Sequence, residues 1–256
     1  MHHEPDDDVY AFVTRARSGE YLLLTLAGDS YSEMRYLRAD DPLGAFQVLE
    51  PRRRGVEYYA DQHADRFLIY TNDQAPNFRL VEAPTASPGR ARWRELIPNR
   101  EDRLIDDISA FRDHLVVYER GEGLRHIRLS DPDGVSNVRY VSFPDPVYTF
   151  RTDTFRENVN PEFDSPFLRF HYSSFATPES TVDVDVASGE WHVRKRQAVP
   201  GGFDPGRYVV RRLAAPASDG ARVPMALVHR RELALDGSHP LLLEGYGAYG
   251  RCVEAG

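Results

Sequence analysis

The stretch Arg66-Phe-Leu-Ile-Tyr-Thr71 is a short apolar run between polar residues, which is typical of a buried β-strand. Runs of this kind recur along the chain at offsets of 45, 48 and 53 residues. They are Tyr21-Leu-Leu-Leu-Thr-Leu26, Arg66–Thr71 itself, His114-Leu-Val-Val-Tyr-Glu119 and Phe167-Leu-Arg-Phe-His-Tyr172. A second set of segments recurs at offsets of 47, 45 and 53 residues. Its members are Phe46-Gln-Val-Leu, Trp93-Arg-Glu-Leu, Val138-Arg-Tyr-Val and Trp191-His-Val-Arg.

Two independent sets of segments therefore keep one period, and each repeat has room for four short strands. In the second repeat we expect strands at residues 56–61, 66–71, 77–82 and 92–97. Four-stranded antiparallel units that recur every ~40–50 residues are typical of β-propeller blades. A β-sandwich would not need a regular period, and a β-solenoid usually has a shorter one. The sequence therefore predicts a mainly β fold with about four blades.

The last repeat contains a clear period-two pattern. Residues 180–186 read Ser-Thr-Val-Asp-Val-Asp-Val, which places three valines on one face of a strand. Asp183 and Asp185 lie on the other face, which we expect to be exposed to solvent. The turn at 187–190 and the alternating segment 191–195 complete a predicted β-hairpin.

Beyond the repeats the pattern changes. Residues 198–206 are dense in proline and glycine and read as a linker. We expect a strand at 207–215, a tight turn at 217–220 and a second strand at 223–230. The apolar segment Pro240-Leu-Leu-Leu-Glu244 is expected to be a short buried strand. A second domain is therefore expected to begin after the linker.

The composition is that of a soluble globular protein, with 41% hydrophobic and 28% charged residues in 256. A net charge of −8 disfavours nucleic acid as a partner and modestly favours cationic ligands. The apolar runs are far shorter than the roughly 20 residues of a membrane span. Because the N-terminus is polar and acidic, we expect no secretory signal and a cytoplasmic location. A lone cysteine, Cys252, excludes an internal disulfide and any CxxC motif.

The motifs that could carry chemistry are incomplete. Residues 245–250 match G-x-G-x-x-G, but a dinucleotide site needs a helix to open at this point and an acidic residue about 20 positions later. We therefore expect a glycine-rich turn there. The chain contains no G-x-S-x-G nucleophile motif. We predict neither a cofactor nor a metal site.

Other polar residues are expected to have structural roles. His126, His171 and His192 lie on alternating strands, where surface or hydrogen-bonded imidazoles are commoner than metal ligands. The pair Asp106 and Asp107 is not expected to act in acid–base catalysis. The run 52–54, Arg-Arg-Arg, could clamp a carboxylate or phosphate, but a solvated loop between blades is the favoured interpretation.

Several motifs occur in an order that resembles the prolyl oligopeptidase family of serine peptidases, in particular its oligopeptidase B branch. The motifs lie at residues 51–58, 66–72, 93–98, 168–178, 184–190, 208–212, 218–225, 227–231 and 240–250. They include Ser218-Asp-Gly-Ala-Arg-Val-Pro-Met225 and Pro240-Leu-Leu-Leu-Glu-Gly-Tyr-Gly-Ala-Tyr-Gly250, and the specific signal is their order and spacing together. The resemblance extends from about Asp8 to Gly250.

The resemblance implies a domain organisation. The family pairs a seven-bladed propeller with an α/β-hydrolase domain. Residues 8–197 would then be the C-terminal half of the propeller, and 198–206 the linker. Residues 207–250 would be the opening strands of the hydrolase domain, and 251–256 a divergent tail.

The resemblance also implies an activity. Oligopeptidase B-like enzymes cleave short peptides after Arg or Lys without a cofactor, and their propeller limits access to the active site. Tyr246, in the motif Tyr246-Gly-Ala-Tyr249, matches the family's oxyanion-hole tyrosine. The family's Ser-Asp-His triad has no counterpart among these residues, so we expect this chain alone to be inactive.

The alternative to a peptidase fragment is a free-standing propeller-like binding module without peptidase activity. Four blades can close a small propeller in principle. Against this alternative, the strands after Gly206 would expose apolar edges such as Leu241–Leu243, which is an aggregation hazard. A third alternative is that a separate chain carrying the triad completes the enzyme.

Overall fold

The computed structural model describes residues 3–154, 157–248 and 252–254. Its contacts divide the chain into two compact units. The first contains Met1–Gly121, His126–Val141 and Pro161–Ser165. The second contains Glu122–Arg125, Ser142–Asn160 and Pro166–Gly256.

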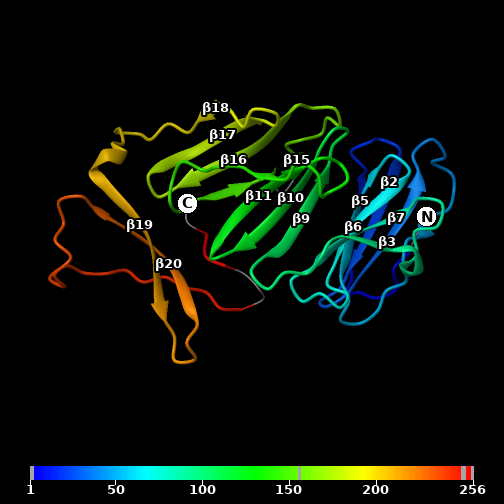
Figure 1. The fold of residues 1–256 in the computed structure, drawn as a ribbon, viewed down its shortest axis with the longest axis horizontal. Helices are drawn as coiled ribbons and strands as arrows, with labels where there is room; N and C mark the ends of the chain where they lie inside the picture. The colour runs from blue at the N-terminus through cyan, green and yellow to red at the C-terminus, as the bar shows by residue number, and fades with distance from the viewer. Residues whose placement is uncertain (1–2, 155–156, 249–251, 255–256) are drawn as a thin grey trace. The chain divides into compact units, whose positions relative to one another are not determined.

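Four antiparallel sheets of four strands follow one another along the chain (Figure 1). The first contains β1 (Tyr10–Arg15), β2 (Tyr21–Ala27), β3 (Ser32–Arg38) and β4 (Gln47–Val48). The second contains β5 (Tyr58–His63), β6 (Arg66–Thr71), β7 (Arg79–Pro84) and β8 (Arg94–Ile97). The third contains β9 (Leu104–Ala110), β10 (Leu115–Gly121), β11 (Leu124–Ser130) and β12 (Arg139–Tyr140). The fourth contains β13 (Thr149–Arg151), β16 (Phe167–Ser174), β17 (Thr177–Asp185) and β18 (Trp191–Arg196).

The sheets confirm the repeat that was inferred from the sequence. The first set of recurring segments forms the second strand of each sheet, and the second set forms or borders the fourth strand. The longer final offset has a simple cause. A small hairpin, β14 (Asp153–Thr154) and β15 (Glu157–Asn158), is inserted between the first and second strands of the fourth sheet. The chain is therefore a partial β-propeller with four four-stranded repeats.

Strand β6 is buried on both of its faces. Phe67 and Ile69 belong to a cluster that includes side chains of β2 and β3. Leu68 belongs to a second cluster that includes side chains of β9 and β10. Phe67, Leu68 and Ile69 are all fully buried. The second sheet thus packs between the first and the third, as propeller blades do, and this explains why the β6 sequence is continuously apolar.

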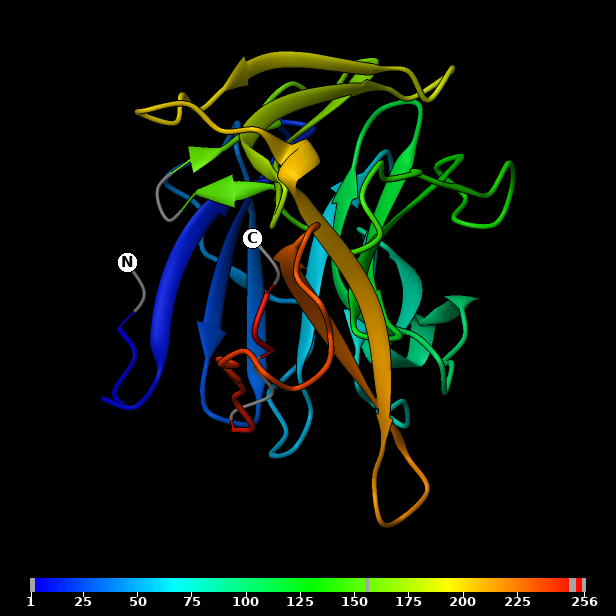
Figure 2. The same ribbon diagram turned by 90° about the vertical axis from the view of Figure 1, so that its left-hand side faces the viewer.

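A long hairpin follows the four sheets (Figure 2). Strands β19 (Tyr208–Pro216) and β20 (Arg222–Arg230) pair over their whole length, which confirms the two strands and the turn expected here. The linker contains one 3₁₀ turn, η2 (Pro205–Arg207), which Asp204 caps through the backbone N–H of Gly206. A similar turn, η1 (Arg90–Arg92), precedes β8.

The prediction of a strand at Pro240–Glu244 is wrong. The segment has no regular secondary structure, and Leu241, Leu242 and Leu243 are 75%, 89% and 81% exposed. A strand needs neighbours that satisfy its backbone N–H and C=O groups and cover its apolar side chains. No described residue of the chain forms a ladder with this segment.

Within the described ranges, no helix has the length and the hydrophobicity that crossing a membrane would require.

Candidate functional site

Tyr246, the oxyanion-hole residue suggested by the resemblance, lies in the irregular segment after Leu243. Its side chain is 55% exposed, and its hydroxyl has no hydrogen-bond partner in the described part of the chain. The space around the α-carbons of Gly245 and Gly247 is open. Tyr249 and Gly250, which complete the motif, lie outside the described residues. The Tyr246 hydroxyl is therefore free to donate a hydrogen bond, and its role remains a prediction.

The three histidines on alternating strands make local contacts. The His126 ring nitrogen Nε2 lies 3.2 Å from the Gly121 carbonyl oxygen, and His171 Nδ1 lies 3.3 Å from the Thr181 hydroxyl. His192 packs edge-on against the ring of Phe167, with ring centroids 5.8 Å apart. Over the described ranges, no group of three or more His, Cys, Asp or Glu side chains could hold a metal ion.

The arginine run at 52–54 binds the protein's own carboxylates. Arg52 pairs with Glu4 at 2.6 Å and with Glu33 at 3.5 Å, and its pKa is raised mainly by the hydrogen bond to Glu4. Arg53 pairs with Asp73 at 3.2 Å. The run lies in the loop between the first and second sheets, as expected, but two of its guanidinium groups are occupied.

Asp183 does not face solvent, contrary to the expectation from the alternating pattern. Its side chain is 4% exposed because Arg169 on β16 and Arg194 on β18 lie over it. Both Arg169 bonds are short, at 2.6 and 2.8 Å, and Arg194 donates at 2.8 Å. The hydrogen bond from Arg169 is the main cause that holds the Asp183 pKa below its usual range. Two covering arginines therefore turn an apparent solvent face into a buried ionic site.

The second sheet repeats this arrangement. Glu82 on its third strand pairs with Arg66 from the second strand and with Arg94 from the fourth. An acidic residue on a third strand thus bridges two arginines in both sheets. Of the Asp106 and Asp107 pair, Asp106 pairs with Arg120 at 3.4 Å, which fits a structural role.

His114, just before β10, is a buried titratable group. Its ring stacks on Phe111 at 4.3 Å with an interplanar angle of 17°. Burial lowers the pKa of His114 to about 4, so the imidazole is neutral at pH 7. It lies in the core of the first unit and has a structural role.

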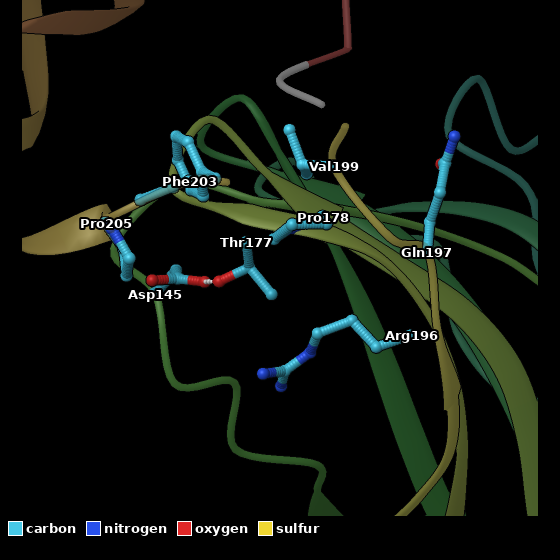
Figure 3. A pocket seen from close by; sticks show the side chains of 9 residues that line it. Asp145, Thr177, Pro178, Arg196, Gln197, Val199, Phe203 and Pro205 are labelled. Atoms are coloured by element: carbon cyan, nitrogen blue, oxygen red, sulfur yellow. Dashed lines mark hydrogen bonds between the residues drawn. The ribbon is translucent and has the colours of Figure 1, made fainter. Parts of the chain in front are cut away.

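A pocket of about 550 Å³ lies at one end of the fourth sheet (Figure 3). Its polar side chains come from the loop before β13, from the start of β17 and from the end of β18. These are Asp145, Thr177, Arg196 and Gln197. Val199, Phe203 and Pro205 of the linker form an apolar wall. The volume is within the range of small-molecule sites, about 300–1,000 Å³.

Sequence reasoning missed this pocket. Asp145 and Thr177 are 32 positions apart and meet only because the strands of the fourth sheet bring them together. The linker was interpreted as a connection, yet Phe203 and Val199 line the pocket. The linker's apolar residues, unusual in a solvated connection, were the available signal.

The succession of four-stranded sheets can be compared with known proteins. The family model for the prolyl oligopeptidase N-terminal β-propeller domain matches residues 1–197 of the sequence, which is more than three quarters of the chain. The chain belongs to the prolyl oligopeptidase family. This confirms the resemblance noted in the sequence.

Curated relatives of the chain are peptidases by name. Dipeptidyl aminopeptidase BI of Pseudoxanthomonas mexicana is 37% identical over 99% of this chain and 34% of its own length. Protease 2 of Moraxella lacunata is 28% identical over 96% of this chain and 34% of its own length. The chain therefore spans about a third of the relatives that it matches.

Solved structures of oligopeptidase B have the same fold. The enzyme of Leishmania major superposes on this chain with a TM-score of 0.87 and is 28% identical to it. The match covers 99% of this chain and 36% of the Leishmania chain. The Trypanosoma brucei enzyme, in a closed form with covalently bound antipain, has a TM-score of 0.85, at 31% identity over 98% and 36%.

Proposed function

We propose that this chain is part of an oligopeptidase B-like serine endopeptidase that cleaves short peptides after Arg or Lys. One observation carries the proposal. The propeller match ends at Gln197, whereas the likeness to solved oligopeptidases B covers 98–99% of the chain. The likeness thus continues through the β19–β20 hairpin. This supports residues 207–250 as the opening segment of a catalytic α/β-hydrolase domain, with β19 and β20 as its first strands, and 198–206 as the linker.

In this proposal the four sheets are propeller blades that limit access to the active site. Tyr246 donates its hydroxyl hydrogen to the oxygen that becomes negative when the scissile carbonyl is attacked. The nucleophile and its base come from residues outside these 256, so the chain alone does not hydrolyse peptides. The net charge of −8 supports a preference for basic peptides through long-range attraction.

A chimeric enzyme tests the proposal. These 256 residues would replace the matching third of the Pseudoxanthomonas mexicana relative, and kcat and KM would be measured on peptides with Arg, Lys or Ala before the scissile bond. We expect a preference for Arg and Lys. Tyr246→Phe should lower kcat by about 10²–10³-fold with little change in KM, because the hydroxyl acts on the transition state.

Tyr10→Phe is the matched control, since Tyr10 is 78% exposed on β1. A Tyr246→Phe chimera with unchanged kcat would overturn the oxyanion role, and equal cleavage after Ala would overturn the specificity. We expect the isolated 256-residue chain to be inactive. This expectation would be contradicted if the isolated chain hydrolysed an Arg peptide and a serine-directed inhibitor blocked the reaction.

A second candidate is release of dipeptides from free N-termini. It is favoured by the 37% identity to a protein named dipeptidyl aminopeptidase. Peptides with free and blocked N-termini, given to the enzyme of which we propose these residues form part, distinguish the two candidates. An endopeptidase cleaves N-acetylated peptides, whereas a dipeptidyl aminopeptidase requires the free amino group.

A further inference from the structure

The pocket at the end of the fourth sheet contains a carboxylate that is held in place. Asp145 Oδ2 accepts hydrogen bonds from the Tyr172 hydroxyl at 2.5 Å and from the Thr177 hydroxyl at 2.8 Å. Tyr172 is 2% exposed, and burial followed by the bond to Asp145 raises its pKa, so it remains a donor. Two neutral donors on one oxygen orient the carboxylate without neutralising its charge. Asp145 thus presents a fixed negative charge to the pocket.

A positive charge lies in the same pocket. Arg196 at the end of β18 forms no ion pair with a carboxylate in the described part of the chain, and its Nε donates a weak bond to the Ser180 hydroxyl at 3.4 Å. Figure 3 shows its side chain extending toward the Asp145 side of the pocket. Its terminal nitrogens are therefore available to a ligand in the pocket.

The third feature is the apolar wall from the linker. Phe203 stacks on Tyr208 with ring centroids 5.6 Å apart and an angle of 20°, which fixes the ring at the pocket. Val199 and Pro205 extend this wall. A ligand that touched the wall would therefore also order the linker, which otherwise lacks regular structure apart from η2.

The charges select the ligand class. A ligand with only a negative charge would be attracted by Arg196 but repelled by Asp145. A ligand with only a positive charge would be attracted by Asp145 but repelled by Arg196. A molecule with separated ammonium and carboxylate groups satisfies both. Carboxylate–guanidinium pairs are also among the stronger charge-assisted hydrogen bonds.

We propose that this pocket binds a small zwitterion of the free dipeptide class. The ammonium group pairs with Asp145, the carboxylate with Arg196, and an apolar side chain lies against Phe203 and Val199. Tyr246 does not line this pocket, and the proposal does not depend on peptidase activity.

Calorimetric titration of the 256-residue chain with alanyl-leucine tests the site. We expect saturable one-to-one binding with a dissociation constant of about 1 mM. N-acetyl-alanyl-leucine lacks the ammonium group, and alanyl-leucine amide lacks the carboxylate. Each should bind about tenfold more weakly or not at all, since each loses one charged contact. Because these ligands are tested on the unaltered protein, misfolding of a variant cannot explain the result.

Two variants assign the ends of the ligand. Asp145→Asn should weaken binding of alanyl-leucine about tenfold but should not weaken binding of the N-acetyl form, and Arg196→Gln should weaken binding of alanyl-leucine but not of the amide. Lys195→Gln, on the same strand but outside the pocket, is the control and should bind normally. Hydrogen exchange of residues 198–206 should slow when dipeptide is added. The proposal is overturned if alanyl-leucine does not bind at 10 mM, or if the blocked dipeptides bind equally well.

Discussion

The sequence Leu-Leu-Leu occurs twice in this protein, with opposite outcomes. At 22–24 it lies in β2, where Leu23 and Leu24 are 3% and 4% exposed. At 241–243 it is 75–89% exposed and has no regular structure. In β2, Leu23 pairs with Thr14 on one side and with Tyr36 on the other. An apolar run is therefore buried only where neighbouring strands satisfy its backbone and cover its side chains.

The difference in burial between the two Leu-Leu-Leu runs also explains which parts of the chain we expect to resist unfolding. Neighbouring sheets of the first unit pack against each other, so the apolar residues of β6 and most of those of β2 are buried. The segment 231–248 contributes apolar surface without a cover in the described part of the chain. In our proposal, this segment belongs to a catalytic domain that would supply the cover.

The largest difference in the free energy of unfolding is expected between a substitution in the buried core and one in the exposed segment 231–248. Phe67→Ala removes a fully buried ring that packs against the rings of Tyr21 and Tyr36. Their ring centroids lie 5.5 Å and 5.1 Å from that of Phe67. It should lower the free energy of unfolding by about 3–5 kcal/mol. Leu242→Ala should change it by less than about 0.5 kcal/mol. Urea denaturation followed by circular dichroism measures both, and equal losses would refute the contrast.

The buried His114 should make the stability of the first unit depend on pH. Its folded pKa of about 4 lies below the ordinary value of 6.5, so between these values the unfolded chain binds a proton that the folded chain does not. Stability should therefore fall by up to about 3 kcal/mol as the pH drops from 6.5 to 4.

His114→Phe keeps the stacking on Phe111 and should remove this loss, whereas the partly exposed His171→Gln should retain it. Denaturation midpoints at pH 7 and pH 4 provide the measurement. A His114→Phe variant with the same pH dependence as the unaltered chain would show that another group is responsible.

A smaller effect is expected at Asp183. Asp183→Asn weakens two arginine contacts, and because both arginines are about half exposed, the loss should be about 1–2 kcal/mol. Since the folded pKa is depressed, this stabilisation is present above the unfolded pKa of about 4 and disappears as the pH falls through the folded value.

The matched control is Asp236→Asn in the exposed C-terminal segment, where the carboxylate accepts bonds only from Ser238 among the described residues. Its effect on the urea midpoint should be smaller than that of Asp183→Asn. The reverse order would contradict the assignment of Asp183 as a buried ionic site.

Local patterns predicted the blades well because strands are encoded by short apolar runs and turns. Arg66–Thr71 and its three counterparts were identified as strands from their composition, and their spacing gave the repeat. The insertion of β14 and β15 changed only the last offset, so the period remained visible.

Long-range features were not predictable in this way. Period two places Asp183 opposite the valines, but it does not reveal that Arg169 and Arg194 cover that face. The hydrophobicity of Leu241–Leu243 predicts burial, but not whether a partner strand is present. Asp145 and Arg196 meet in one pocket through the fold of the fourth sheet.

Hydrogen–deuterium exchange of the whole chain, read peptide by peptide, tests the central contrast most directly. Amides of β2 and β6 should exchange only by opening of the sheets and remain protected for minutes or longer. Amides of 240–248 should exchange within seconds. If peptides from 240–248 were as protected as those from β2, the segment would be paired in solution and our account of the two Leu-Leu-Leu runs would be wrong.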